Sequence, residues 1–95
     1  MHCKRHETAG RIVFAFCDKN LIGKKFEENG IVLDLNRYRD FFKGSDLDLF
    51  NGPFQSINAV GKKSTDFLVD NGVAKREDVR FIQEIPVLQV FRMKG

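Results

Sequence analysis

One unbroken apolar segment constrains the fold of this chain more than any other feature. It reads Arg11-Ile12-Val13-Phe14-Ala15-Phe16-Cys17 and lies between Gly10 and an Asp18-Lys19-Asn20 turn signal. β-Branched and aromatic residues favour strands, and the absence of polar alternation indicates burial on both faces. We therefore predict that residues 11–17 form the central strand of a sheet.

Further strands are expected on both sides of this segment. Residues 31–35 predict a second strand with Ile31, Leu33 and Leu35 on one face, after a turn at Asn29-Gly30. Residues 54–60 alternate imperfectly and fit either a third strand or the first turns of a helix. Residues 79–82 and 87–93 predict a closing hairpin that bends near Gln83-Glu84. Residues 21–30 fit a short helix or an irregular turn, because Gly23 weakens a helix.

Three segments of the chain carry helical signals. The main helix is predicted at about residues 62–71, ending at Gly72, where a left-handed cap is expected. Residues 36–43 predict one or two helical turns, and residues 45–48 predict the start of another short helix that Gly52 and Pro53 end. The expected fold is α+β, with a mixed, mainly antiparallel sheet of four or five strands packed on the main helix and one or two short helices.

The length of the chain predicts one domain spanning residues 1–95, with residues 1–6 as a flexible tail. The longest apolar run is about six residues, against roughly 20 for a membrane span, so no membrane association is expected. The N-terminus lacks the apolar stretch of a secretion signal, and two cysteines are too few for a disulfide framework. These features together predict a cytoplasmic protein with reduced thiols.

Several landmarks occur in the order found in one known family. They are residues 13–18, residues 21–24, residues 58–61, Gly72, and Pro86 followed by Gln89-Val90. The chain resembles the small archaeal family known as domain of unknown function 424 over roughly residues 8–93. The resemblance implies no activity, substrate or cofactor, although an association of such proteins with translation genes favours an RNA or ribosome connection. Family members often carry His after the proline of the last strand, whereas here Pro86 precedes Val87.

Basic residues are the main candidates for a binding site. The net charge is +3, and the candidate contacts to RNA are Lys24, Lys25, Arg37, Arg39, Lys62 and Lys63. Tyr38 could stack on a base between two arginines. Each Gly-Lys-Lys triplet, at residues 23–25 and 61–63, could also offer backbone amides to a phosphate. The alternative is an ordinary solvated surface, because acidic residues are interspersed with the basic ones.

The remaining candidates are cysteines and histidines. Cys17-Asp18 at a strand end could be a reactive thiol beside an acid, but a buried structural thiol is favoured because the histidines, His2 and His6, lie on the terminal segment. His2, Cys3, His6 and Cys17 could supply zinc ligands, although their spacing is unlike that of structural zinc sites. We expect no metal, no cofactor and no catalytic residues.

Three hypotheses on function follow from the sequence. The first is a non-catalytic binding module that contacts RNA or the ribosome through the six cations. The second is a protein-interaction or homodimerisation domain that uses a Phe-rich surface or an exposed sheet edge. The third, least favoured, is an enzyme built on Cys17 and Asp18.

Overall fold

The computed structural model describes residues 1–44 and 54–91 of the chain. The short helix predicted to begin at residues 45–48, with its stop at Gly52 and Pro53, lies outside the described residues, as do the last residues of the final predicted strand. Within the described part no helix is long and apolar enough to cross a membrane.

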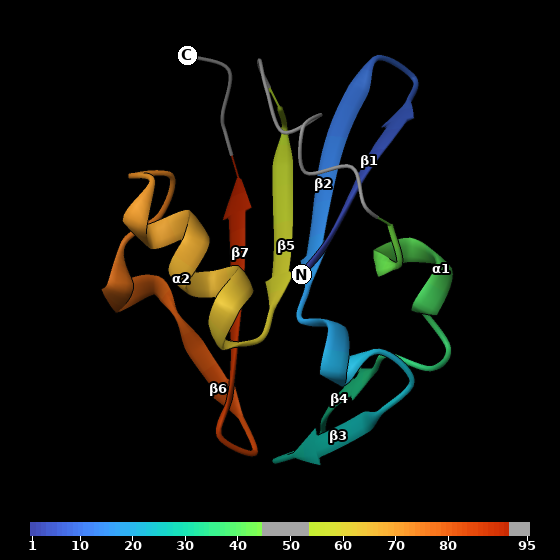
Figure 1. Cartoon of the computed structure of the whole chain (residues 1–95), viewed down its shortest axis with the longest axis vertical. Helices are drawn as coiled ribbons and strands as arrows, with labels where there is room; N and C mark the ends of the chain where they lie inside the picture. Colours follow the sequence, from blue (N-terminus) through green and yellow to red (C-terminus); the bar gives the residue numbers. More distant parts are fainter. Residues whose placement is uncertain (45–53, 92–95) are drawn as a thin grey trace.

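A five-stranded sheet forms the centre of the molecule (Figure 1). Its strands are β1 (His2–Thr8), β2 (Arg11–Cys17), β5 (Ser56–Val60), β6 (Arg80–Ile82) and β7 (Ile85–Phe91), in the order β1-β2-β5-β7-β6. Only the pairing of β2 with β5 is parallel, and the other pairs are antiparallel. The predicted α+β fold with a mixed, mainly antiparallel sheet is confirmed, and residues 56–60 are a strand rather than a helix.

The β1 strand corrects one expectation. Residues 1–6 were expected to be a flexible tail, but β1 pairs along its whole length with β2, from His2 opposite Cys17 to Thr8 opposite Arg11. The turn between them uses Ala9 and Gly10, both with positive φ. The expectation was wrong because the segment has few apolar residues, whereas its order comes from pairing with the apolar strand beside it.

A second correction concerns residues 21–30. This region forms a 3-10 turn, η1 (Lys19–Leu21), followed by strand β3 (Lys25–Glu28), which pairs with β4 (Ile31–Asp34) in a separate two-stranded sheet. Asn29 and Gly30 both have positive φ, as the predicted turn requires. The strand predicted at residues 31–35 therefore exists, but it joins this small hairpin and not the main sheet.

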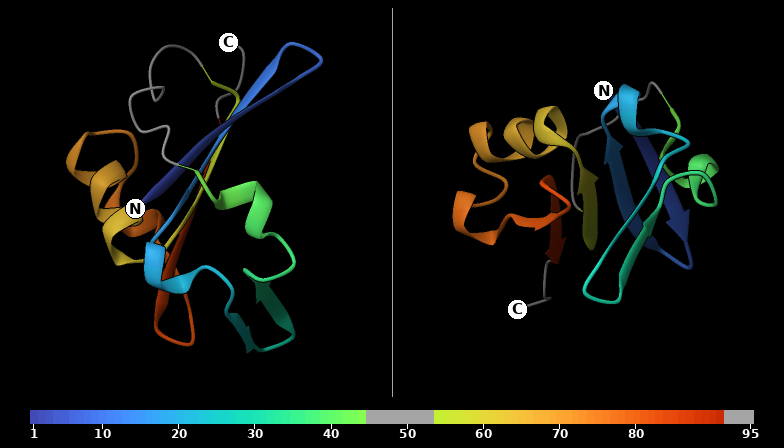
Figure 2. Two further views of the ribbon diagram at one scale, coloured as in Figure 1. Left: turned by 45° about the vertical axis from the view of Figure 1, so that its right-hand side comes forward. Right: turned by 90° about the horizontal axis from the view of Figure 1, so that it is seen from below.

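Helix α2 (Lys62–Asp70) covers one face of the main sheet, and the small hairpin and helix α1 (Arg39–Phe42) lie on the other (Figure 2). Helix α2 matches the predicted main helix, and its Leu68 packs with Phe14, Phe16 and other side chains of one face. On the other face, Ala15 and Cys17 pack with Leu35 and with Phe42 of the short helix α1. The 3-10 turn η3 (Arg76–Asp78) precedes β6. The centre of β2 is therefore buried on both faces, as predicted.

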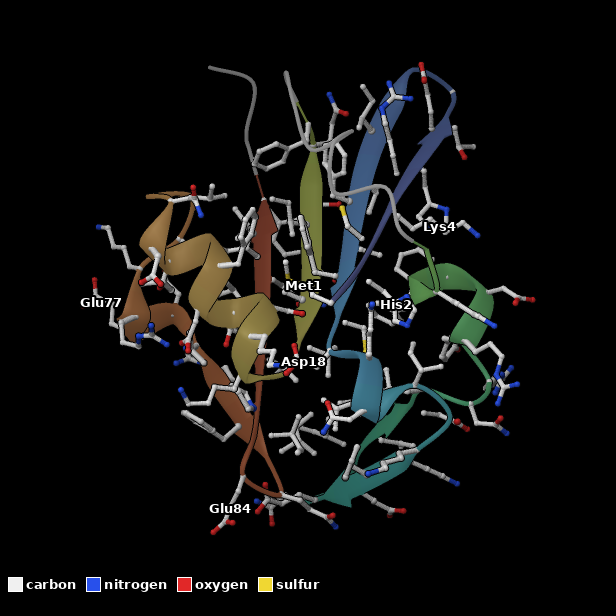
Figure 3. The ribbon with its side chains drawn as sticks, viewed as in Figure 1. Met1, His2, Lys4, Asp18, Glu77 and Glu84 are labelled. Atoms are coloured by element: carbon white, nitrogen blue, oxygen red, sulfur yellow. The ribbon has the colours of Figure 1, made fainter. Side chains whose placement is uncertain are left out.

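The side chain of Asp18 joins the end of β2 to the start of α2 (Figure 3). Its buried carboxylate accepts hydrogen bonds from the Lys63 amide at 3.1 Å and from the Ser64 amide and hydroxyl, both at 2.8 Å. Unpaired amides at a helix start are stabilised by such an acceptor, and a negative charge suits the helix dipole there. Asp18 therefore caps α2 from a distant strand.

Gly61 makes this cap possible. It has φ of 108°, and a Cβ atom added to it would collide with the Asp18 side chain. Any other residue would meet both the backbone strain and this collision. The sequence Gly61-Lys62-Lys63-Ser64 is thus explained by the cap.

We predict that Asp18→Ala lowers the free energy of unfolding by about 2 kcal/mol, because it leaves the buried Ser64 hydroxyl and two helix amides without their acceptor. Gly61→Ala should destabilise the protein by a similar or larger amount. Urea denaturation followed by circular dichroism measures both changes. Asp70→Ala, at an exposed position of the same helix, is the matched control and should change stability by less than about 0.5 kcal/mol. Equal stabilities of the Asp18 and Asp70 variants would contradict the capping role.

Candidate binding groove

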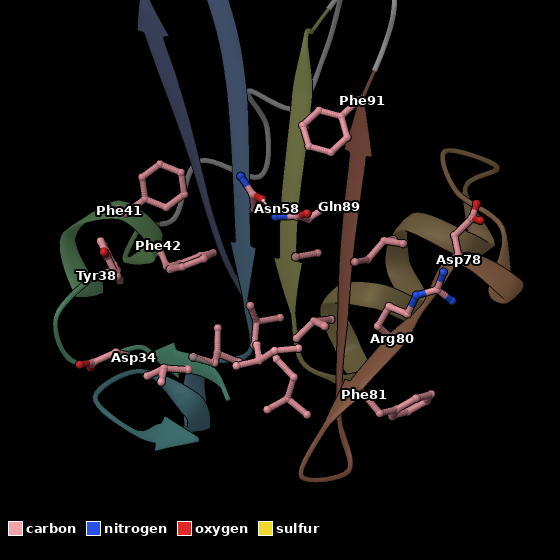
Figure 4. A pocket seen from close by; sticks show the side chains of 18 residues that line it. Asp34, Tyr38, Phe41, Phe42, Asn58, Asp78, Arg80, Phe81, Gln89 and Phe91 are labelled. Carbon is pink, nitrogen blue, oxygen red and sulfur yellow. Dashed lines mark hydrogen bonds between the residues drawn. The ribbon is translucent and has the colours of Figure 1, made fainter. Parts of the chain in front are cut away.

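A groove of about 1040 Å³ lies on the face of the main sheet opposite α2 (Figure 4). Strands β5, β7 and β6 form its floor and one side, and β4 with the α1 region forms the other side. The lining residues are 31–34, Tyr38, 41–42, 58–60, Asp78, 80–82, 87–89 and Phe91. The groove is therefore built from segments of both halves of the chain.

The groove gathers most of the large apolar side chains that remain exposed among the described residues. Five such side chains are between 51% and 70% exposed, and four of them line the groove with their side chains: Ile31, Val32, Tyr38 and Phe91. The fifth, Phe81, lies opposite Pro86 on the α2 face of the sheet, because it alternates with Arg80 and Ile82 along β6. Exposed apolar side chains scattered singly are normal, whereas a contiguous set marks a surface that binds something. The concentration of these side chains in one hollow makes the groove the leading candidate site.

A pair of amides divides the groove floor. Gln89 of β7 lies opposite Asn58 of β5 and donates a hydrogen bond to its side-chain oxygen at 3.2 Å. Phe91 lies beyond this pair on the same face of β7, because side chains two residues apart on a strand share a face. Floor polarity is thus confined to two neutral side chains, which can fix the orientation of an apolar ligand.

The charged residues of the groove are Asp34, Asp78 and Arg80. The Arg37 amide donates to the Asp34 carboxylate at 2.9 Å and holds the pKa of that carboxyl below its ordinary value, with the charges of Lys25 and Arg37 acting in the same direction. Asp34 is therefore ionised at neutral pH. The groove lining carries two carboxylates and one guanidinium, and this excess of negative charge disfavours binding of a polyphosphate.

The two sides of the groove meet at the β6–β7 turn. Gln83 donates its backbone amide to a Glu28 side-chain oxygen at 3.0 Å and its side-chain amide to the Glu27 carbonyl at 2.7 Å. Gln83 and Glu84 both have positive φ, which confirms the predicted bend. This contact ties the β3–β4 hairpin to the main sheet at one end of the groove.

The structure separates the six predicted RNA contacts into two groups. Lys24, Lys25, Arg37 and Arg39 belong to the lobe made of β3, β4 and α1. Lys25 lies opposite Asp34, and the Arg39 guanidinium reaches Asn36 at 2.9 Å and lies close over Gly23. Four of the cations thus share one lobe beside the groove.

The other two cations, Lys62 and Lys63, are on α2, which covers the opposite face of the sheet. Lys62 pairs with Asp66 at 3.2 Å, and Arg76 pairs with the same carboxylate at 2.7 Å, so that these partners lower the pKa of Asp66. The amides of Lys63 and Ser64 already bind Asp18. The possibility that residues 61–63 cradle a phosphate is therefore wrong, because the protein's own carboxylate occupies that position.

Cys17 and Asp18 have structural surroundings. The Cys17 side chain is fully buried and lies 3.4 Å from the Asp18 carbonyl oxygen, and the Asp18 carboxylate is committed to the start of α2. Burial raises the pKa of the Cys17 thiol from 9.0 to about 12, with a further contribution from the Asp18 charge. A thiol that holds its proton so firmly is a poor nucleophile at neutral pH.

The side chains considered as possible zinc ligands do not converge. Alternate residues of a strand point to opposite faces, and Cys3 is buried on the α2 face whereas His2 and His6 contact the α1 region on the other face. Within residues 1–44 and 54–91, His, Cys, Asp and Glu side chains form no group of three that could hold a metal ion.

The sequence analysis missed the groove residues. Gln89 and Phe91 were predicted only as part of the strand at residues 87–93, and nothing local to β7 shows that their face remains open in the fold. Asn58 was predicted only as part of a strand or helix at residues 54–60 and of a family landmark at residues 58–61. The available signal is that the strands carry more aromatic residues than one covering helix can bury.

We predict that native protein reacts slowly with a thiol reagent at pH 8, because Cys3 and Cys17 are both buried and Cys17 stays protonated. Denaturation in urea should expose two reactive thiols per chain. A raised thiol pKa in the folded state means that stability is retained below pH 9.0 and is lost as the pH rises through about 12. Rapid labelling of Cys17 in the native state, located by mass spectrometry, would contradict this assignment.

Comparison with known proteins places the chain in a family. The nearly full-length fold is similar to that in the "Crystal structure of an uncharacterized conserved protein from Methanopyrus kandleri", with a TM-score of 0.77, 20% sequence identity, and coverage of 99% of this chain and 97% of that chain. No curated protein matches the chain. The sequence matches the family described as "Protein of unknown function (DUF424)" over residues 6–93. The chain therefore belongs to the DUF424 family.

Proposed function

We propose that this protein is a non-catalytic binding module that takes a segment of a partner protein into the groove. The observation that carries the proposal is the gathering of four of the five exposed large apolar side chains of the described residues in one hollow. Water contact with apolar surface costs free energy in proportion to its area, so a partner that covers these side chains gains affinity. Tyr38 and Phe91 are of the aromatic type that dominates binding energy in protein interfaces.

The charges of the groove define the chemistry of the partner segment. Asp34 and Asp78 outnumber Arg80, so the segment we propose is apolar and carries a lysine or arginine that reaches one of the carboxylates. The Asn58–Gln89 pair on the floor can hydrogen-bond to the backbone of the bound segment. A second copy of this chain is a special case, in which the groove would be the interface of a homodimer.

RNA or ribosome binding is a second candidate, favoured by the four cations of the β3–β4–α1 lobe. The Arg37 guanidinium lies 5.5 Å from the centre of the Tyr38 ring, so a charge and an aromatic ring are available together at the edge of the groove. The carboxylates of the groove and the pairing of Lys62 with Asp66 count against this candidate. We therefore place it second.

We also propose that the module acts in the cytoplasm, since both cysteines are free and buried in the folded chain. A non-catalytic role is supported by the firm protonation of Cys17 and by the use of Asp18 as a helix cap.

We predict that a displayed library of random peptides selects apolar sequences with a basic residue. Binding is measured by the fluorescence of Tyr38, because the chain has one tyrosine and no tryptophan and the selected peptides can be made without either. Val32→Asp and Phe91→Asp should each weaken binding at least tenfold, because a charge then enters an apolar contact. Thr8→Asp adds the same charge at an exposed position outside the groove and should leave binding unchanged.

Two outcomes would replace this proposal. Salt-sensitive binding of oligouridine that Lys25→Glu and Arg37→Glu abolish, without peptide selection, would establish the RNA candidate in its place. Peptide binding that neither groove substitution weakens would show that the groove is not the site. A concentration-dependent dimer that Val32→Asp dissociates would identify a second copy of the chain as the partner.

A further inference from the structure

The outer face of β1 holds the α1 side of the groove. Lys4 donates a hydrogen bond to the Asp40 carbonyl at 2.6 Å, and the His6 Nε2 atom lies 2.8 Å from the Phe41 carbonyl oxygen. The His2 Nδ1 atom lies 2.9 Å from the Gly44 carbonyl oxygen. Figure 3 shows His2 and Lys4 beside the α1 region. Three side chains of one strand thus bind carbonyls in the α1 region.

His6 also contacts the groove wall through its ring. The imidazole stacks on the Phe41 ring, with centroids 4.4 Å apart and planes 9° from parallel. The Phe41 and Phe42 rings pack edge to face with their centroids 5.1 Å apart, and both phenylalanines line the groove. A change at His6 is therefore one side chain away from the groove surface.

Helix α1 depends on such contacts because it is too short to be stable without tertiary contacts. It has four residues and no side-chain hydrogen bond at its N-cap, and helices this short are unstable in isolation. Its burial rests on Phe42, which packs against the main sheet. The β1 side chains add three hydrogen bonds to the α1 region, so the strength of these bonds affects how firmly α1 is held.

We infer that His6 is a proton-sensitive positioning residue, which fixes the α1 wall more firmly when its imidazole is protonated. A neutral imidazole donates from Nε2 in only one of its two tautomers, whereas the protonated ring always donates there. The bond to the Phe41 carbonyl then becomes charge-assisted, and the cation lies over an aromatic ring. Imidazole is also the side chain that ordinarily changes charge between about pH 5 and 8. The effect on ligand affinity rests on the proposed function, whereas the effect on α1 does not.

Some of the neighbouring charges favour a positive charge on His6, and others oppose it. On β1 itself, Lys4 and His2 share the face of His6 and oppose a further positive charge there. Asp40 on α1 favours the charge, whereas Arg39 beside it opposes it, as do Lys43 after the helix and Arg11 on β2. The N-terminal amine and the Cys17 thiol belong to the His2 end of the strand. The direct bond to Phe41 and the ring contact decide the sign, since both form at van der Waals or hydrogen-bond distance and the exposed cations are screened by solvent.

The protonation of His2 has a smaller effect. Its Nδ1 atom lies within hydrogen-bond distance of both the carbonyl oxygen and the amide of Gly44, at 2.9 and 3.2 Å. A neutral ring can accept from the amide or donate to the carbonyl, and a protonated ring can only donate. One bond is exchanged for another, so His2 serves as the internal control for His6.

The test measures hydrogen-exchange protection of the α1 amides at pH 5 and pH 8. The Phe41 and Lys43 amides bond to the Tyr38 and Arg39 carbonyls and report on the helix directly. We predict protection about fivefold greater at pH 5, from the gain of a charge-assisted bond, with a midpoint equal to that of the His6 ring resonances. His6→Gln, which retains a neutral donor, should remove the pH dependence, and His2→Gln should retain most of it.

Failure of this inference is distinguishable from failure of the proposed function. If His6→Gln shows the same pH dependence of protection as the wild type, or if the His6 ring and the α1 amides titrate with different midpoints, the inference is overturned, whatever peptides bind. If the protection of the α1 amides changes with the protonation of His6 but no peptide binds at either pH, the positioning role is supported and the proposed function fails. If a selected peptide binds the wild type several-fold more tightly at pH 5, and His6→Gln removes the difference, both are supported.

Discussion

The bond between Asp18 and the start of α2 is the interaction on which the rest of the structure depends. It links the end of the buried strand β2 to the helix that follows β5, and it requires glycine at position 61. Because β2 and β5 are parallel neighbours, their ends meet at one edge, and the cap fixes α2 over a single face of the sheet. The opposite face is then left for the β3–β4 hairpin and α1, which cover only part of it. The uncovered part is the groove.

This arrangement explains why the molecule leaves large apolar side chains in water. The second face is covered less completely than the first, because α2 has nine residues, whereas α1 has four and each strand of the hairpin has four. The Phe91 side chain of β7 therefore remains 70% exposed on this face. Exposed surface of this kind lowers solubility and favours association, which is the reason for proposing a partner that covers it.

The sequence predicted those features that local pattern determines. The unbroken apolar run of β2, the turn at Asn29-Gly30 and the helix before Gly72 were all found because each is encoded within a few residues. Strand β1 was missed because its side chains are mostly polar and their partners lie in α1, from 35 to 42 residues away. The phosphate hypothesis at residues 61–63 failed for a similar reason, since the competing acceptor, Asp18, is about as distant along the chain. The groove is assembled from five separate segments, and no pattern within one segment indicates that their shared face stays open.

The most direct test of this account is an amide-resolved NMR titration of the full chain with a selected apolar peptide and, separately, with oligouridine. The account predicts that the peptide shifts the resonances of the groove strands β4 and β7 and of Tyr38, with little change at the exposed lysines of the lobe or of α2. Shifts confined to Lys24, Lys25 and their neighbours on addition of oligouridine, with no response of β7 to any peptide, would contradict it.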